Sequence, residues 1–116
     1  MIKIVDGKPY LDQVKALIIE YTEWLGRDLS FQNLDKELAD IAEKYTAPNG
    51  ELLVAIDENE VVLGMVAYYQ HSDTRCEMKR LYVRSTGRGR ALGDRLIERI
   101  MEHAKNSGYT EMVLDT

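Results

Sequence analysis

The stretch RLYVRSTGRGRALGDRLIERIMEHAKNSG, residues 80–108, decides the fold of this chain. It begins as a buried strand, continues through a loop rich in glycine and arginine, and ends in an amphipathic helix expected from Ala91 to Lys105. The unpaired N–H groups of a first helical turn carry partial positive charge and bind anions through the backbone. A strand, a small-residue loop and a helix start in this order predict a phosphate site.

Charge is distributed unevenly along the chain. The 116 residues carry a net charge of −5, yet Arg75–Arg99 holds eight basic and three acidic residues. The overall negative charge argues against a nucleic-acid binder, because affinity for a phosphate backbone comes mostly from lysine and arginine. One basic patch on an acidic protein favours a small polyanionic ligand. For Arg95 and Arg99 we favour a solvated helix face, since acidic neighbours stand within one turn.

The composition, 45% hydrophobic and 30% charged, is that of one globular domain covering residues 1–116. No apolar run approaches the ~20 residues of a membrane-spanning helix, and a secretory signal is not evident, so we expect a cytoplasmic protein without a membrane partner. The single cysteine, Cys76, excludes an internal disulfide and is expected to be a buried strand residue. His71 and His103 stand far apart without an acidic or cysteine partner at ligand spacing, so no metal site is predicted.

Hydrophobic periodicity predicts the order strand, helix, helix, three strands, helix, strand. The segments are a strand at 1–5, helices at 9–26 and 33–45, strands at 51–56, 61–70 and 75–83, the helix 91–105 and a strand at 111–115. The three middle strands form an antiparallel meander, and the last strand runs parallel to 75–83 after a right-handed crossover. The predicted fold class is therefore α/β (α+β), with a mixed, mostly antiparallel central sheet flanked by helices.

Two common phosphate loops do not fit residues 87–93. A Walker loop ends in Gly-Lys-Ser/Thr, whereas this loop continues as Gly93-Asp94-Arg95. A dinucleotide fingerprint has glycines at its first, third and sixth positions, whereas here they fall at the first, third and seventh. A third kind of loop fits better.

Arg88-Gly89-Arg90-Ala91-Leu92-Gly93 resembles the Arg/Gln-x-x-Gly-x-Gly/Ala signature of the GNAT superfamily of N-acetyltransferases, which holds the pyrophosphate of acetyl coenzyme A. Residues 77–83 are similar to the family's fourth strand, and residues 108–116 to its fifth. The element order from Met1 onward also matches, so the resemblance covers the whole chain, although the specific motif residues lie between 77 and 116. Ala91 stands where the family most often has glycine, and as a small residue it is expected to have a slight effect.

The resemblance implies an acetyl-CoA-dependent N-acyltransferase that transfers an acetyl group to a primary amine of a small molecule or protein, without a metal. An amine with a pKa of ~10.4 is mostly protonated at neutral pH, so a base must remove a proton before nitrogen attacks the thioester. The family often places a glutamate on this strand as the base, which makes Glu77 the catalytic candidate. Strand alternation predicts that it lies on the same side as Lys79, Leu81 and Val83. The alternative is a structural carboxylate paired with Arg75 or Lys79.

The resemblance also implies the coenzyme A site. Its expected members are Leu81, Tyr82, Val83, Arg88, Gly89, Arg90, Ala91, Leu92 and Gly93. For Arg88 and Arg90 we favour contact with the ligand over a role as exposed surface charge. The glycines of this loop have no side chain, which is useful where a ligand approaches the backbone closely. Tyr68, Tyr69 and Tyr82 are expected to pack in strands with exposed hydroxyls. In the family a tyrosine from the C-terminal part of the domain often protonates the departing thiolate, and any of these three could replace it.

One departure concerns the end of the chain. In the family the domain continues with a further helix and two strands, which this chain lacks. Two alternatives follow: a non-catalytic coenzyme A binding or dimerisation module, or a fragment of a longer polypeptide. The open strand edge near Glu111–Thr116 further predicts a homodimer through that edge.

Overall fold

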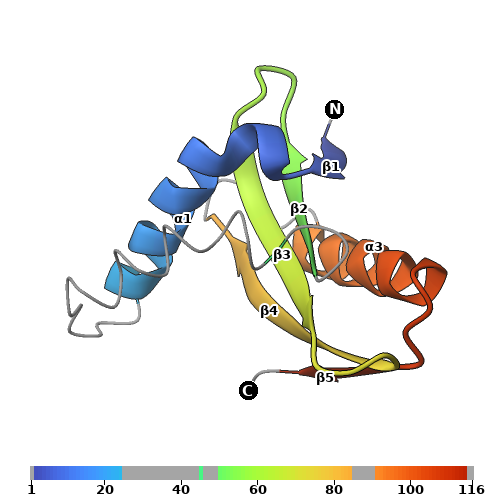
Figure 1. The fold of residues 1–116 in the computed structure, drawn as a ribbon. Helices are drawn as coiled ribbons and strands as arrows, with labels where there is room; N and C mark the ends of the chain where they lie inside the picture. The colour runs from blue at the N-terminus through green and yellow to red at the C-terminus, as the bar shows by residue number, and fades with distance from the viewer. Residues whose placement is uncertain (1, 25–44, 46–49, 85–90, 115–116) are drawn as a thin grey trace.

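A computed structural model describes residues 2–24, 45, 50–84 and 91–114 of the chain. Their five strands form one sheet in the order β1-β2-β3-β4-β5 (Figure 1). The elements are β1 Lys3–Asp6, the 3-10 turn Lys8–Tyr10, α1 Leu11–Trp24, β2 Gly50–Ile56, β3 Val62–Gln70, β4 Arg75–Val83, α3 Leu92–Asn106 and β5 Glu111–Leu114. The helix expected at 33–45 lies outside the described residues, apart from the buried Tyr45.

The sheet is antiparallel from β1 to β4 and parallel between β4 and β5. The mixed, mostly antiparallel sheet predicted from the sequence is therefore confirmed. β4 and β5 are joined by α3, and the β4–β5 ladder runs from Arg75↔Glu111 to Met78↔Leu114. Within the described residues this ladder reaches no further along β4.

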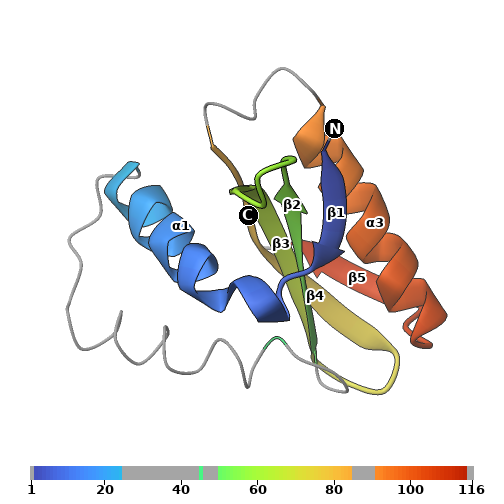
Figure 2. The ribbon, with the colours of Figure 1, turned by 90° about the horizontal axis from the view of Figure 1, so that it is seen from above.

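The two helices cover opposite faces of the sheet, as Figure 2 shows. On one face α1 buries Val14, Leu17 and Ile18, the middle of the apolar stripe expected for this helix. On the other face α3 buries one residue per turn: Leu92, Leu96, Ile100 and Ala104. The sequence-based bounds of α3 are thus right to within one residue at each end.

A backbone irregularity in β4 changes which side chains share a face. Arg80 has φ 62, in the left-handed region, and the β3–β4 register shifts between Met65 and Ala67. Such a bulge places one extra residue on its strand and resets the alternation of side chains beyond it. Leu81 and Val83 therefore pack on the α3 face.

The expectation that Glu77 shares a side with Leu81 and Val83 is consequently wrong. Glu77 is paired with Tyr69 of β3, whose ring packs against the core under α1. Glu77 therefore lies on the α1 face, opposite to the two apolar residues. Alternation along the strand predicted the wrong face because nothing in the sequence around Arg80 signals a bulge.

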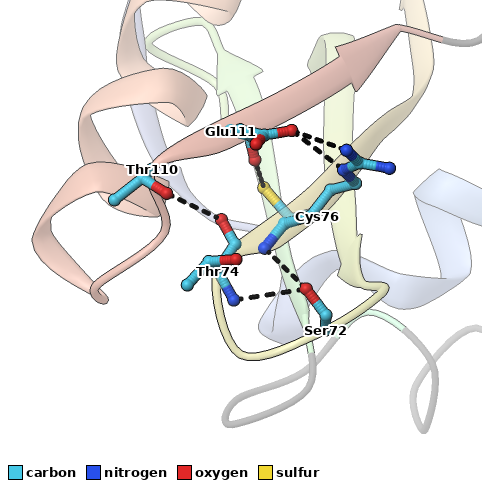
Figure 3. A network of polar contacts seen from close by, with 6 residues as sticks. Ser72, Thr74, Cys76, Thr110 and Glu111 are labelled. Carbon is cyan, nitrogen blue, oxygen red and sulfur yellow. Dashed lines mark hydrogen bonds and ion pairs between the residues drawn. The ribbon is translucent and has the colours of Figure 1, made fainter.

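The start of β5 is fastened to the β3–β4 turn by polar contacts (Figure 3). Arg75 pairs with Glu111 at 2.8 Å, and Thr110 Oγ1 donates to the Thr74 carbonyl at 3.4 Å. Ser72 Oγ accepts N–H bonds from Thr74 and Arg75, which shapes the turn itself. These contacts fix the register at which β5 joins β4.

Candidate functional site

The region predicted to bind phosphate begins where α3 begins. Ala91 is the N-terminal cap residue with φ 53 and ψ 31, and no side chain caps the helix there. Leu92, directly after it, is 1% exposed and anchors the first turn in the core. Of the predicted loop ligands, Arg88, Gly89 and Arg90 lie outside the described residues. The described part is thus a helix start that is anchored by a buried leucine and has no side-chain cap from Ala91.

Gly93 lies in this first turn and faces open space. Among the described residues, no atom lies within 4 Å of the position that a Cβ of Gly93 would take, and Gly93 does not have a positive φ. Neither packing nor backbone conformation therefore requires glycine at this position. A glycine at such a position lets another group approach the backbone closely.

The strand residues expected at the coenzyme A site have their side chains in the core. Leu81 and Val83 pack toward α3, whereas Tyr82 is 7% exposed on the α1 face. A ligand along this part of β4 would consequently contact backbone atoms. The backbone role expected for Leu81 and Val83 stays a prediction.

A carboxylate from α1 holds the end of β4 beside this region. Glu20 accepts a hydrogen bond from the Tyr82 hydroxyl and one from Arg84 Nε, each at 3.0 Å. Arg84 also donates to the Val62 carbonyl at 3.2 Å. These contacts join α1, β3 and β4 at the point where the chain enters the loop.

Glu77 lies near the other end of β4, in a polar cluster that we call the Glu77 cluster: Tyr69, His71, Glu77 and Lys79. Tyr69 donates its hydroxyl proton to Glu77 Oε1 at 3.1 Å. His71 Nε2 lies 2.7 Å from the same oxygen, and Lys79 Nζ lies 3.3 Å from Oε2. Both carboxylate oxygens are therefore engaged.

The cluster shifts the titration of Glu77. Burial alone would raise the pKa of Glu77, but hydrogen bonds from Lys79 and Tyr69, the Lys79 charge and the His71 contact together lower the pKa below its ordinary value. Glu77 is thus an anion at neutral pH. The predicted pairing with Lys79 is confirmed, whereas Arg75 pairs with Glu111 instead.

The expectation of exposed hydroxyls is wrong for Tyr68 and Tyr82, which are buried, and the hydroxyls of all three strand tyrosines form hydrogen bonds. Tyr68 is 2% exposed and donates to Ser107 Oγ at 3.4 Å. Tyr69 and Tyr82 donate to Glu77 and Glu20. Each hydroxyl already serves a polar partner, because a buried phenol without one would lose a hydrogen bond on folding.

The chain was compared with known proteins. Residues 18–116 match the family model described as the acetyltransferase (GNAT) family. The chain belongs to the GNAT acetyltransferase family. An uncharacterised N-acetyltransferase of Schizosaccharomyces pombe is 48% identical over 107 residues, which are 91% of this chain and 66% of that protein. This chain thus spans just under two thirds of the length of that relative.

Solved structures share the GNAT fold. An acetyltransferase of the GNAT family from Staphylococcus aureus Mu50 aligns with a TM-score of 0.87 and 16% identity, covering 100% of this chain and 73% of that one. AAC(6')-Iy, solved with the bisubstrate analogue CoA-S-monomethyl-acetylneamine, aligns with a TM-score of 0.74 and 17% identity, covering 100% and 80%. At these identities the likeness shows the fold.

Two residues of this GNAT domain that sequence reasoning did not select contact the candidate site residues in the structure. No local pattern indicates Glu20, because its partners Tyr82 in β4 and Arg84 directly after β4 are 62 and 64 residues away in sequence. His71 was set aside for lack of a nearby acidic partner. The signal for His71 was the hairpin itself, since pairing of β3 with β4 brings Tyr69 opposite Glu77 and the cluster residues onto one face.

Other sequence expectations for the GNAT domain can also be compared with the structure. Cys76 is buried, and burial raises the pKa of its thiol, as suits an unreactive strand residue. Arg95 and Arg99 are exposed, and Arg95 donates to the Ile2 carbonyl at 3.4 Å.

Over residues 2–24, 45, 50–84 and 91–114, no cluster of three or more His, Cys, Asp or Glu is placed to hold a metal ion. The helices in those ranges are too short or too polar to span a membrane.

The conformation of Ala91 leads to a stability prediction. A left-handed conformation costs an L-residue roughly 1–2 kcal/mol, so this alanine is strained where glycine would not be. We expect Ala91→Gly to raise the free energy of unfolding by about 1 kcal/mol. Urea denaturation measures the change.

The control is Ala16→Gly, at an exposed position inside α1. There the same replacement should lower the free energy of unfolding by about 1 kcal/mol, because glycine is a poor helix former. Equal losses at both positions would contradict the strain at Ala91.

Proposed function

We propose that this protein transfers an acetyl group from acetyl-CoA to a primary amine of a small molecule or protein. The observation that carries the proposal is the first turn of α3, which lacks a side-chain cap and leaves open space over Gly93, in a chain of the GNAT family. A methyl group at Gly93 would meet no described atom, which leaves room for an anion to approach the backbone there. The bisubstrate analogue bound by AAC(6')-Iy, which joins CoA to acetylneamine, supports a ligand of this class.

The proposed coenzyme A site extends along β4 and onto α3. The backbone N–H groups of Arg88, Gly89, Arg90, Ala91, Leu92 and Gly93 bind the pyrophosphate, with the positive end of the helix dipole behind them. The two arginines add charge. Backbone groups of Leu81, Tyr82 and Val83 orient the pantetheine arm.

Acetyl-CoA, when bound, supplies an activated thioester carbonyl. From Glu77 to Val83, next to the loop, the strand rises by about 20 Å at ~3.3 Å per residue. Over this distance only an extended pantetheine arm could join the proposed pyrophosphate site to the Glu77 cluster. Its thioester end would then lie near the Glu77 cluster.

The proposed role of Glu77 is to remove the proton of the incoming ammonium group. The carboxylate is an anion at neutral pH and lies on the α1 face with a 14% exposed side chain. A cationic amine is attracted to this carboxylate and to the acidic residues outside the basic stretch 75–99. Deprotonation leaves a lone pair on nitrogen that attacks the thioester carbonyl.

Two measurements test the proposed function. Saturating acetyl-CoA should raise the melting temperature, because a ligand that binds only the folded state stabilises it by about 2.7 kcal/mol at 100 times Kd. Release of free thiol should then accelerate above background with at least one member of a panel of primary amines. An unchanged melting temperature would overturn the ligand assignment.

A non-catalytic coenzyme A binding module is the second candidate. It is favoured by the Glu77 cluster, because a carboxylate held by three donors with a lowered pKa is a weak base. Both candidates predict that acetyl-CoA raises the melting temperature. It differs in predicting thiol release at background with every amine, and no effect of Glu77→Gln on that rate.

We also propose self-association through the β5 edge. Among the described strands β5 pairs with β4 alone, and Leu114 is 59% exposed at its end. An uncovered edge strand tends to pair with another chain. Light scattering at working concentration should give the mass of a dimer, and Leu114→Lys should reduce it toward that of a monomer. A monomeric mass for the unmodified protein would contradict the proposal.

The proposed setting is the cytoplasm, without nucleic-acid or membrane partners. Its support is the net charge of −5 and the single buried cysteine, which suits a reducing compartment.

A further inference from the structure

The Glu77 cluster contains a second titratable group that the proposed function leaves unused. His71, in the turn between β3 and β4, places Nε2 at 2.7 Å from Glu77 Oε1. The contact requires Nε2 to carry the proton when the ring is neutral, because the carboxylate can only accept. The lone pair of the neutral imidazole is then on Nδ1, on the other side of the ring.

The surroundings of His71 hold the ring in this orientation. The Tyr69 ring lies 5.1 Å from the imidazole, centroid to centroid, and its hydroxyl shares Glu77 Oε1 with His71. Lys79 binds the other carboxylate oxygen and lies 5.5 Å from the centre of the Tyr69 ring. The charged and titratable groups of the cluster around His71 are therefore one carboxylate, one ammonium and one phenol.

Accessibility separates the two candidate bases. The side chain of His71 is 34% exposed, whereas that of Glu77 is 14% exposed and has donors on both oxygens. Imidazole is also the side chain that changes charge between pH 5 and 8, which suits a general base at neutral pH. Glu77 is placed to orient a base rather than to meet the substrate.

We propose that His71 and Glu77 form a catalytic dyad in which His71 Nδ1 accepts the proton of the substrate ammonium group and Glu77 is the positioning residue. This inference rests on the proposed acetyl transfer, and it replaces Glu77 with His71 as the group that takes up the proton directly. In this dyad the carboxylate of Glu77 fixes the tautomer of His71 and stabilises the charged form of the imidazole.

The proposed step balances as follows. The ammonium group gives one proton to Nδ1, and the freed lone pair forms the N–C bond to the thioester carbonyl. The C–S bond then breaks, and sulfur leaves with its electron pair. The nitrogen loses a second proton, the thiolate takes up one proton, and one proton in total passes to solvent when His71 returns to neutral.

The test compares His71→Gln with His103→Gln, a change of the other histidine in the chain, which lies on α3. With the amine that the unmodified protein turns over best, His71→Gln should lower kcat by about 100-fold or more, within the range for loss of a general base. The KM for acetyl-CoA should stay within threefold, and added imidazole should restore part of the rate. His103→Gln should keep the kcat of the unmodified protein.

The pH profile gives a second readout. The acidic limb of kcat/KM in the unmodified protein should disappear in His71→Gln and persist in His103→Gln. If His71→Gln keeps its kcat while Glu77→Gln loses it, Glu77 is the base and the dyad is overturned.

A ligand-binding readout separates the possible failures. Acetyl-CoA should raise the melting temperature of His71→Gln as much as that of the unmodified protein, which shows that the variant folds and binds. If acetyl-CoA stabilises the unmodified protein but no amine accelerates thiol release, the dyad is overturned while coenzyme binding stands. If acetyl-CoA stabilises neither protein, the proposed function falls and the dyad with it.

Discussion

Gly93→Ala is expected to weaken acetyl-CoA binding by roughly 10- to 100-fold without destabilising the fold. The new methyl group would stand in open space over the first turn of α3, where the pyrophosphate is proposed to bind. Loss of one hydrogen bond to a charged group costs about 1.5–3 kcal/mol, which sets the size of the effect. Because alanine favours a helix over glycine, the melting temperature of the ligand-free variant should stay the same or rise slightly.

Isothermal titration calorimetry of acetyl-CoA against both proteins measures the change. The control is Asn106→Ala, at an exposed position at the opposite end of α3, which should leave affinity unchanged. Unchanged affinity in Gly93→Ala would show that the phosphates bind elsewhere. A large loss of stability in the ligand-free variant would contradict the open space above this turn.

Glu77→Gln is expected to lower kcat by about 100-fold or more while the KM for acetyl-CoA stays nearly constant. The amide keeps the size of the carboxylate but cannot remove a proton or stabilise an imidazolium. Steady-state kinetics over a range of pH measures the change. The control is Glu98→Gln on the exposed surface of α3, which should keep the kcat of the unmodified protein.

The same variant has a second expected effect, on stability. The folded-state pKa of Glu77 is depressed, so its contribution is present above the unfolded pKa and is lost as pH falls through the folded value. Glu77→Gln should therefore be less stable than the unmodified protein at pH 7, and the difference should shrink below about pH 4. A kcat that is unchanged together with this stability loss would make Glu77 purely structural.

The sequence predicted the elements of the sheet well, because each strand carries a strong local signal. The bounds of β4 were right to the residue, and α3 was right to within one residue at each end. The parallel pairing of β5 followed from the length of the crossover through α3. These features depend on periodicity and on turn residues, both of which are local.

The candidate site could be predicted only where it is local too. The Gly93 region was predicted from the glycine spacing together with the resemblance to the GNAT signature, whereas the left-handed conformation of Ala91 was not predicted, since alanine gives no hint of a positive φ. The bulge at Arg80 reversed the expected face of Leu81 and Val83. A shift of one residue in a strand moves every later side chain to the other face, and alternation cannot reveal it.

Contacts between distant segments were the least predictable part. Glu20 reaches Tyr82 and Arg84 across more than sixty residues. His71 meets Glu77 because the two strands pair in one of several registers that the sequence allows. Both contacts depend on tertiary packing, which composition and spacing do not encode.

The proposed binding of coenzyme A at the start of α3 is tested most directly by following backbone amide resonances during a titration with acetyl-CoA. The N–H groups of Leu92, Gly93 and Asp94 point out of the first helical turn, so hydrogen bonds to phosphate should shift their signals more than those of the rest of α3. We expect the largest shifts in these three amides, reduced in Gly93→Ala. Binding that leaves these amides unchanged and shifts those of another segment would contradict the proposed site.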